Sequence, residues 1–525
     1  MALQMQNSKT WKIDDNVHAD DLKTADPNDP LNWPQWYKHY MATVISIAMM
    51  MCNFLAAGPF IAMVNITMDF FPGAHPAKNP RLFGSSVAKV AYFFTTTALL
   101  QGVGNFIWVP VANKYGRRPI YVLSYLIYFA TAIWLSFEHS YGGFLAGRIL
   151  MGFGAGAAET VAPITIADIY FLHERGTVMA FYSSFLSVGA AVGLVISGLI
   201  TIHHHWRVIF QVASALIGLV HLFAIFAFPE TAYTRNSSLG ESKTDSSAGS
   251  GSSSDATSSS EKVEKNFALS DPKKDAEKAT TSSHIPPKNT YLQTLKVFHG
   301  TFTSESLAKL VLRPLGLICL PPVLWVALVE AATIGFLVAM TSNVEVAFER
   351  TYHFESYQVG LCFVAAIIGS LVGIPVGGKF GDKVADWFTR RNEGIRNPEM
   401  RLPAMIPAMI TAPLGLVLFV NFAIVQGTNI ALVYVIDAYR PVAGEVTLAV
   451  MGFKSLFGFL LSFYTNTWVT QSGYLNAYGT MGAISAAVLL CWIPLYIWGK
   501  QVRHATWHWR IVRYVDWSDD REVGE

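Results

Sequence analysis

The sequence predicts an all-α integral membrane protein in which twelve transmembrane helices form two six-helix halves around a central cavity. Its 525 residues are 52% hydrophobic and only 14% charged, whereas soluble domains carry about 25% charged residues. Twelve apolar runs are long enough to cross a bilayer, and one long polar stretch separates the sixth run from the seventh. The net charge of +2 gives no reason to expect nucleic acid as a partner.

Each predicted span is a run of about 20 largely apolar residues, the length that an α-helix needs to cross the hydrocarbon core. The runs are 41–68, 87–112, 119–137, 143–171, 178–201, 207–228, 314–341, 357–378, 403–425, 429–450, 455–472 and 477–499. The first run follows a polar segment that is too long to begin a signal peptide, so we expect it to remain in the membrane.

The runs divide the chain into five parts: an N-terminal segment 1–39, a first six-helix half 40–228, a linker 229–313, a second half 314–499 and a tail 500–525. Residues 236–262 are mostly serine, glycine and charged residues, which cannot bury enough apolar surface to offset their ordering entropy. We therefore predict a disordered linker there. A simple flexible tether is the default interpretation, and regulation by phosphorylation of its serines is the alternative.

The distribution of basic residues predicts the orientation, because cytoplasmic loops carry an excess of lysine and arginine. With a cytoplasmic N-terminus, the predicted cytoplasmic segments hold 31 of the 38 basic residues, one of them in the short gap between the tenth and eleventh runs. Both termini and the linker are therefore expected on the cytoplasmic side.

Charged side chains deep in a span are candidates for a functional site, because burying them in the membrane costs several kcal/mol. They cluster in every third span, as four copies of a three-helix unit would place them around a shared, water-accessible cavity. Structural ion pairs between packed helices are the alternative. The deep charges are Arg148 and Glu159 in the fourth span, Glu330 in the seventh, and Asp437, Arg440 and Glu445 in the tenth.

Residues 109–121 read V-P-V-A-N-K-Y-G-R-R-P-I-Y directly after the second span. This stretch resembles the loop signature G-x-L-A-D-R-x-G-R-[KR] of the major facilitator superfamily. Gly116, Arg117 and Arg118 match, and Asn113 replaces the acid. A second copy after the eighth span, 378–383, keeps the acid as Asp382. The resemblance implies that these residues form a gating latch between the halves on the cytoplasmic side.

Four further segments resemble the fungal drug:proton antiporter branch of that superfamily: 26–33, 168–176, 229–231 and 398–402. Arg148, followed by Gly152, resembles the fourth-span motif whose arginine is linked to proton coupling. The fifth span carries Gly189, Gly193 and Gly198 of the antiporter motif, but Leu194 stands where that motif has proline. The resemblance implies proton-driven export, and the altered proline position weakens the case for export more than the case for transport.

These observations predict a proton-coupled exporter of small amphipathic compounds, such as drugs, toxins or secondary metabolites, in the plasma membrane, with the vacuolar membrane as the alternative location. Glu159, Glu330 and Asp437 are the candidate carriers of the proton or substrate cation, and Arg148 and Arg440 are their candidate partners. An uptake permease for an organic cation such as a polyamine, and a nutrient sensor with a transporter fold, are the other hypotheses. No nucleophile–base pair or metal-ligand spacing suggests an enzyme, a cofactor or a metal. The expected partners are the bilayer, a small substrate and protons, and the chain is expected to be monomeric.

Overall fold

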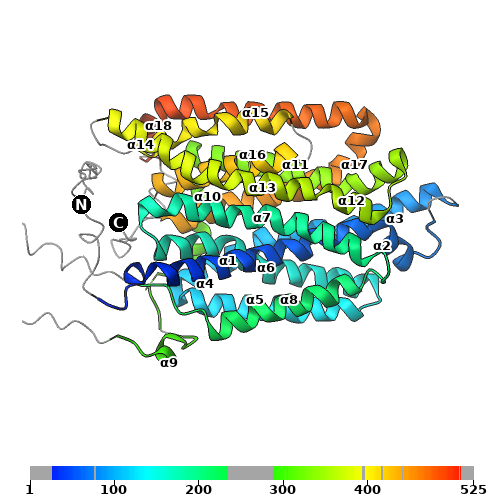
Figure 1. Ribbon diagram of the computed structural model, residues 1–525, viewed down its shortest axis with the longest axis horizontal. Helices are drawn as coiled ribbons and strands as arrows, with labels where there is room; N and C mark the ends of the chain where they lie inside the picture. The colour runs from blue at the N-terminus through cyan, green and yellow to red at the C-terminus, as the bar shows by residue number, and fades with distance from the viewer. Residues whose placement is uncertain are drawn as a thin grey trace, which may run out of the picture.

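The computed structural model describes residues 26–75, 78–233, 288–298, 300–303, 305–392, 397–414, 418–439, 442–507 and 509. Within these ranges all regular structure is helical, and long helices lie side by side along one axis (Figure 1). The all-α prediction is therefore confirmed. The serine-rich stretch 236–262, Arg440 and residues 510–525 of the predicted tail lie outside the described residues.

The first half follows the predicted runs, but two of its spans are interrupted. The run 41–68 breaks at a 3₁₀ helix, Gly58–Ala62, where Pro59 lacks the N–H that a continuous helix needs. The run 87–112 is divided at Gly104 into two helices. The helices of this half are α1 (Gln35–Ala57), α2 (Met63–Phe70), α3 (Pro80–Val103), α4 (Asn105–Tyr115), α5 (Arg117–Phe137), α6 (Tyr141–Ile169), α7 (Leu172–Ile200) and α8 (Val208–Phe226).

The second half begins before the predicted boundary at residue 314 and continues beyond 499. Its helices are α10 (Leu307–Leu317), α11 (Pro321–Tyr352), α12 (Ser356–Cys362), α13 (Val364–Pro375), α14 (Gly381–Arg391), α15 (Ile406–Leu414), α16 (Leu418–Ala438), α17 (Ala443–Leu490) and α18 (Trp492–Trp507), and the short α9 (Tyr291–Thr294) precedes them. Helix α17 joins two helices across a kink at Gly473, where φ is 77°. Glycine adopts this backbone conformation without steric cost.

The predicted bounds of the ninth, tenth and eleventh spans are wrong. The sequence placed breaks between 425 and 429 and between 450 and 455, but α16 runs through the first of these positions and α17 through the second. Two polar residues at the first of these positions form hydrogen bonds inside the bundle. Gln426 donates to the Ala404 carbonyl at 2.7 Å, and Asn429 donates to the Gly377 carbonyl at 2.9 Å.

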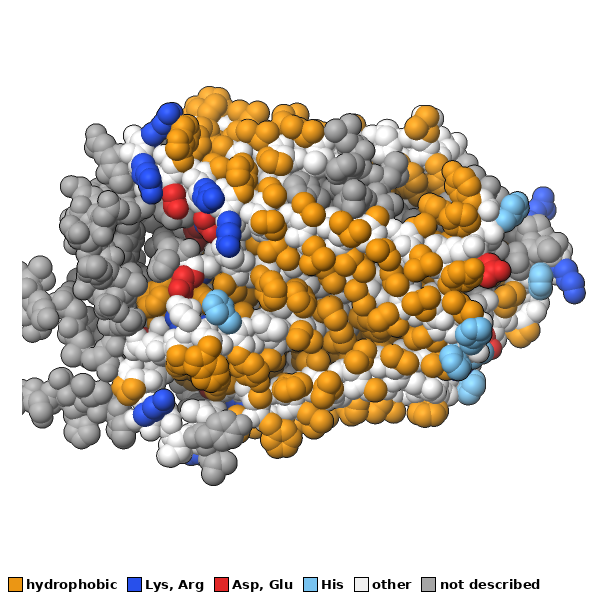
Figure 2. Space-filling view, viewed as in Figure 1, with side chains coloured by type: hydrophobic (Ala, Val, Ile, Leu, Met, Phe, Trp, Pro, Cys, Tyr) orange, Lys and Arg blue, Asp and Glu red, His pale blue; other side chains and the backbone are white. Residues whose placement is uncertain are grey.

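The surface is that of a membrane-spanning protein. Figure 2 shows hydrophobic side chains covering the middle of the molecule, with charged and histidine side chains towards its two ends. Within the described residues, nine helical stretches are long and apolar enough to cross a membrane. The predicted spans 87–112, 403–425 and 429–450 have no counterpart among these nine, although helices occupy those ranges.

The two halves meet along α7, which packs against α12, α13 and α16, and along α3, which packs against α17. Glycines allow this close approach: a Cβ atom on Gly102 of α3 would lie only 2.1 Å from Cβ of Ser455 on α17. Two glycines of the antiporter motif serve packing inside the first half. A Cβ on Gly189 or Gly193 of α7 would lie within 2.5 Å of a backbone carbonyl of α1.

Candidate functional site

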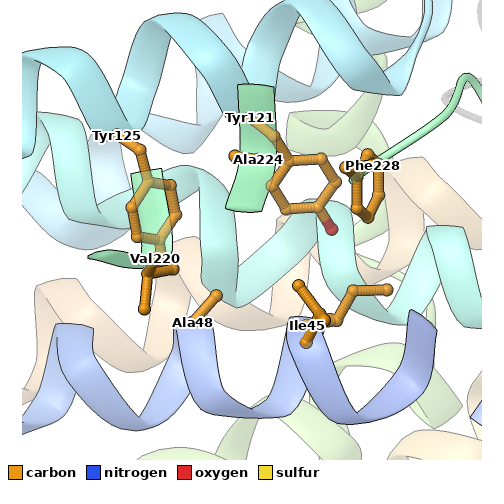
Figure 3. A pocket seen from close by; sticks show the side chains of 8 residues that line it. Ile45, Ala48, Tyr121, Tyr125, Val220, Ala224 and Phe228 are labelled. Carbon is orange, nitrogen blue, oxygen red and sulfur yellow. The ribbon is translucent and has the colours of Figure 1, made fainter. Parts of the chain in front are cut away.

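The pocket in Figure 3 lies between α1, α5 and α8, inside the first half of the molecule. Aliphatic and aromatic side chains line it, among them Ile45, Tyr121, Tyr125 and Phe228, and no charged candidate residue does. Among the described residues no group of histidine, cysteine, aspartate or glutamate is arranged to hold a metal ion. The buried charged side chains are therefore the candidates for the functional site.

An ion pair connects the two halves in the centre of the molecule. The Lys454 ammonium on α17 donates to Oε1 of Glu159 on α6, and the two side chains are only 5% and 3% exposed. Sequence reasoning missed Lys454 because it placed this residue in a loop. Since α17 begins at Ala443, Lys454 lies about 16 Å along the helix axis from its start. The signal was present in the sequence as one lysine within an apolar stretch.

Glu330 of α11 completes this central cluster of Glu159, Glu330 and Lys454. Its side chain is 2% exposed, and the charges of Lys454 and Glu159 both act on its carboxyl group. Among the described residues, no side chain or backbone group forms a hydrogen bond with that carboxyl. Two of the predicted acids are therefore brought together, and both are buried in this conformation.

Polar groups from the first half surround the ion pair. The Tyr182 hydroxyl on α7 donates to the Glu159 backbone carbonyl at 3.0 Å. Next to Glu159, the Thr160 hydroxyl donates to Oδ1 of Asn105 at 2.8 Å, and Nδ2 of Asn105 donates to the Gln101 carbonyl at 2.7 Å. These bonds satisfy the buried groups next to the cluster, so the Glu330 carboxyl remains the acceptor that no described hydrogen bond occupies.

Arg148 lies on the same helix as Glu159 but belongs to a different site. Its guanidinium is fully buried and donates to the backbone carbonyls of Phe93 at 2.9 Å, Leu55 at 3.1 Å and Ala56 at 3.4 Å. Two of these carbonyls belong to the end of α1, where the chain changes to the 3₁₀ helix. Arg148 therefore joins α1, α3 and α6.

The two described members of the predicted group of deep charges in the tenth span, Asp437 and Glu445, lie near helix ends. Asp437 is half-buried in the last turn of α16, and Arg440 lies outside the described residues. Glu445 belongs to the first turn of α17 and pairs with Arg313 of α10 at 3.5 Å. The error follows from the span bounds, because a later start for the tenth span moved these residues from helix ends to its interior.

The first copy of the loop motif caps a helix. Gly116, with φ of 100°, turns the chain into α5. The backbone N–H groups of Arg117 and Arg118 then donate to the Glu230 carboxylate at 2.8 Å and 3.2 Å. A carboxylate at a helix N-terminus is favoured by the helix dipole and by the unpaired N–H groups. Glu230 belongs to the segment 229–231 that drew attention in the sequence.

The arginine side chains of this copy also stay inside the first half. Arg117 pairs with Asp168 at the end of α6, at 3.0 Å. Arg118 donates to the backbone carbonyls of Ile225, at 2.6 Å, and of Phe228. These bonds fix α5, α6 and α8 to one another.

The second copy makes a contact between the halves. Asp382, in the first turn of α14, accepts from Arg401 at 2.6 Å and from the Thr177 hydroxyl of α7 at 3.4 Å. A Cβ atom on Gly176 would lie 2.3 Å from the Asp382 carboxylate, so α7 and α14 approach closely here. We call this end of the molecule, which carries Gly116 and Asp382, the motif end.

Three comparisons relate the chain to known proteins. The sequence profile of the Major Facilitator Superfamily matches residues 41–490. An uncharacterized MFS-type transporter of Schizosaccharomyces pombe is 23% identical over 94% of this chain and 89% of its own length. Efflux pump radE of Floropilus chiversii is 24% identical over 91% and 83%. The crystal structure of the human organic anion transporter MFSD10 (TETRAN) superposes with a TM-score of 0.55 at 13% identity, covering 87% of this chain and 99% of that one.

Proposed function

Because the chain belongs to the major facilitator superfamily, we propose that it is a proton-coupled secondary transporter that exports small amphipathic organic compounds by alternating access. The family and the membrane-spanning helices make it a multi-pass transporter. The similarity to efflux pump radE, at 24% identity, supports export as the direction.

The observation that carries the proposal is the central cluster of two acids and one base between the halves. With both acids ionised, Glu159, Glu330 and Lys454 would leave one negative charge in a closed space, which is costly without compensation. A proton or a cationic substrate removes that cost. Glu159 and Glu330 are therefore the proposed carriers, and Asp437, near the motif end, is not.

The proposed gate is the motif end. Alternating access requires that this end open and close, and Asp382 holds the two halves together there through Thr177. Gly116, Arg117 and Arg118 stiffen the facing half. We propose that this end, with both termini, faces the cytoplasm of a cell whose plasma membrane holds the protein.

The test measures accumulation in intact yeast that lacks its own drug exporters and expresses the full chain. The probes are ethidium and radiolabelled spermidine, at external pH 5 and pH 7, with and without a protonophore. We expect lower ethidium accumulation at pH 5, abolished by the protonophore. Glu330→Gln should abolish this difference at equal surface expression. Asp437→Asn is the matched control and should transport as the wild type does.

Three outcomes would contradict the proposal. Unchanged export by the Glu330→Gln variant would remove the central cluster as the coupling site. Higher spermidine accumulation in expressing cells would establish the alternative function, uptake of an organic cation, which the excess of acid over base in the cluster suits as well. No flux of either probe would leave a transporter-like sensor as the better interpretation.

A further inference from the structure

We propose that Lys454 is a tethered counter-cation that leaves Glu159 and pairs with Glu330 when the halves separate, so that opening releases the proton of Glu330. The inference rests on the proposed function and extends it from the identity of the carriers to the order of events at the site.

The three groups belong to different moving parts. Glu159 lies on α6 of the first half, whereas Lys454 and Glu330 lie on α17 and α11 of the second half. Helix α11 packs along α17, so Glu330 and Lys454 move together. The ion pair between Lys454 and Glu159 joins the halves and must break when they separate.

The closed state fixes one proton on the cluster. The Lys454 ammonium compensates the Glu159 carboxylate. Glu330 is 2% exposed and has no hydrogen-bond partner among the described residues. A buried carboxylate in that situation is expensive, so its neutral, protonated form is favoured.

The open state exchanges the partners. Glu159 moves with α6 into contact with water, which solvates its carboxylate. Lys454 stays buried on α17, and an unpaired buried ammonium is costly. Glu330 is the acid of the cluster that lies on the same half as Lys454. The O–H bond of Glu330 breaks, its proton passes to water in the opened cavity, and the resulting carboxylate pairs with Lys454. One proton leaves, Lys454 and Glu330 compensate each other, and the Glu159 carboxylate is left solvated by water without a counter-ion.

The other titratable groups near the cluster are few among the described residues. The Tyr182 hydroxyl on α7 interacts electrostatically with both Glu159 and Glu330, and the Cys52 thiol on α1 interacts with Glu159. Further along α17, Glu445 has its own partner in Arg313 of α10. None of these supplies a second acid to Lys454 on the second half.

The exchange also defines what the site can bind. Once Lys454 has moved to Glu330, the Glu159 carboxylate is free for an organic cation of the substrate. One monovalent cation then binds for each proton released, which is the stoichiometry of an electroneutral antiporter.

The experiment measures distances between the halves without any substrate or proton gradient. Pairs of spin labels replace Trp36 and Trp387 at the motif end, or Leu199 and Leu361 at the opposite end, all of which are exposed. The four native cysteines are replaced first. Pulsed electron resonance then gives the open and closed populations of the purified full chain in lipid nanodiscs between pH 5 and pH 8.

Release of one proton on opening predicts that the ratio of open to closed molecules rises about tenfold per pH unit in the titrating range. Glu330→Gln mimics the protonated acid and leaves Lys454 without a partner in the open state. This variant should stay closed at every pH. Lys454→Arg keeps the cation and should keep the pH dependence, as should the control Asp437→Asn.

A pH-independent wild type would overturn the inference, and so would a Glu330→Gln variant with the wild-type slope. The first outcome needs no variant, so a folding defect cannot hide the answer. Failure of export in cells would contradict the proposed function. The distance measurement uses no substrate, so it would still decide the role of Lys454 in that case.

Discussion

At the scale of single residues, the hydrogen bonds of Arg148 show that a deep charge can hold helices together. Its guanidinium donates to three backbone carbonyls of α1 and α3. The Cζ atom of the same group lies over the Phe94 ring, 5.0 Å from the ring centroid. Unsatisfied carbonyls inside a membrane protein are expensive, and this arginine satisfies them where α1 is interrupted. The family resemblance implies a part in proton coupling for this arginine, and its hydrogen bonds give it a part in helix packing.

We therefore expect Arg148→Ala to destabilise the protein by roughly 3–5 kcal/mol, because three buried carbonyls lose a charged donor. Thermal unfolding in detergent, followed by tryptophan fluorescence, measures the effect. Arg148→Lys, which keeps the charge but reaches fewer carbonyls, should lie between the alanine variant and the wild type. A wild-type melting temperature for Arg148→Ala combined with lost proton dependence of transport would restore the coupling role.

At the scale of helices and segments, hydropathy located most of the spans. It failed where polar residues lie inside a helix and not at its end. Gln426 and Asn429 give a polar signal inside α16, where they bond to neighbouring helices. Because the predicted bounds were shifted in this way, Lys454 was placed in a loop and Asp437 was placed towards the middle of a span.

The segments on either side of the linker are held by one turn near the N-terminus. The Tyr233 hydroxyl donates to the Asp26 carboxylate, and the Asn289 N–H donates to Oδ1 of Asn28 at 2.8 Å. Nδ2 of Asn32 donates to the Asp26 carbonyl at 2.7 Å and closes that turn. The two ends of the linker are thus fixed independently of its length.

Deletion of residues 238–284 should therefore leave surface expression and ethidium export within about twofold of the wild type, because loop length alone changes the closure entropy only slowly. The matched variant is Asp26→Ala in the full-length chain, which removes the acceptor of Tyr233 and should reduce expression more than the deletion does. Fluorescence size-exclusion chromatography and the ethidium assay compare them. Loss of export on deletion, with normal expression, would favour regulation through the serines.

At the scale of the whole molecule, composition and the repeated loop motif predicted the fold class, and both acids of the central cluster were among the predicted residues. The connection between the halves could not be predicted. It depends on which faces of α6, α11 and α17 meet, and a single sequence does not specify helix rotation within a bundle. The same holds for Asp382, whose contact with Thr177 joins residues far apart in the chain.

The pair of Lys454 and Glu159 is where the two halves depend on each other most directly. Removing one partner of a buried ion pair leaves the other charge uncompensated and costs about 3–5 kcal/mol, whereas replacing both can be nearly neutral. Lys454→Met should therefore lower the melting temperature strongly, whereas Glu159→Gln alone leaves Lys454 beside Glu330. The double variant Glu159→Gln with Lys454→Met should recover most of the loss seen in Lys454→Met. Export should stay abolished in both, because neither has the pair that links proton and substrate to closure. A double variant no more stable than Lys454→Met alone would mean that the two charges do not depend on each other for stability, and that the halves are held by their glycine-mediated packing instead.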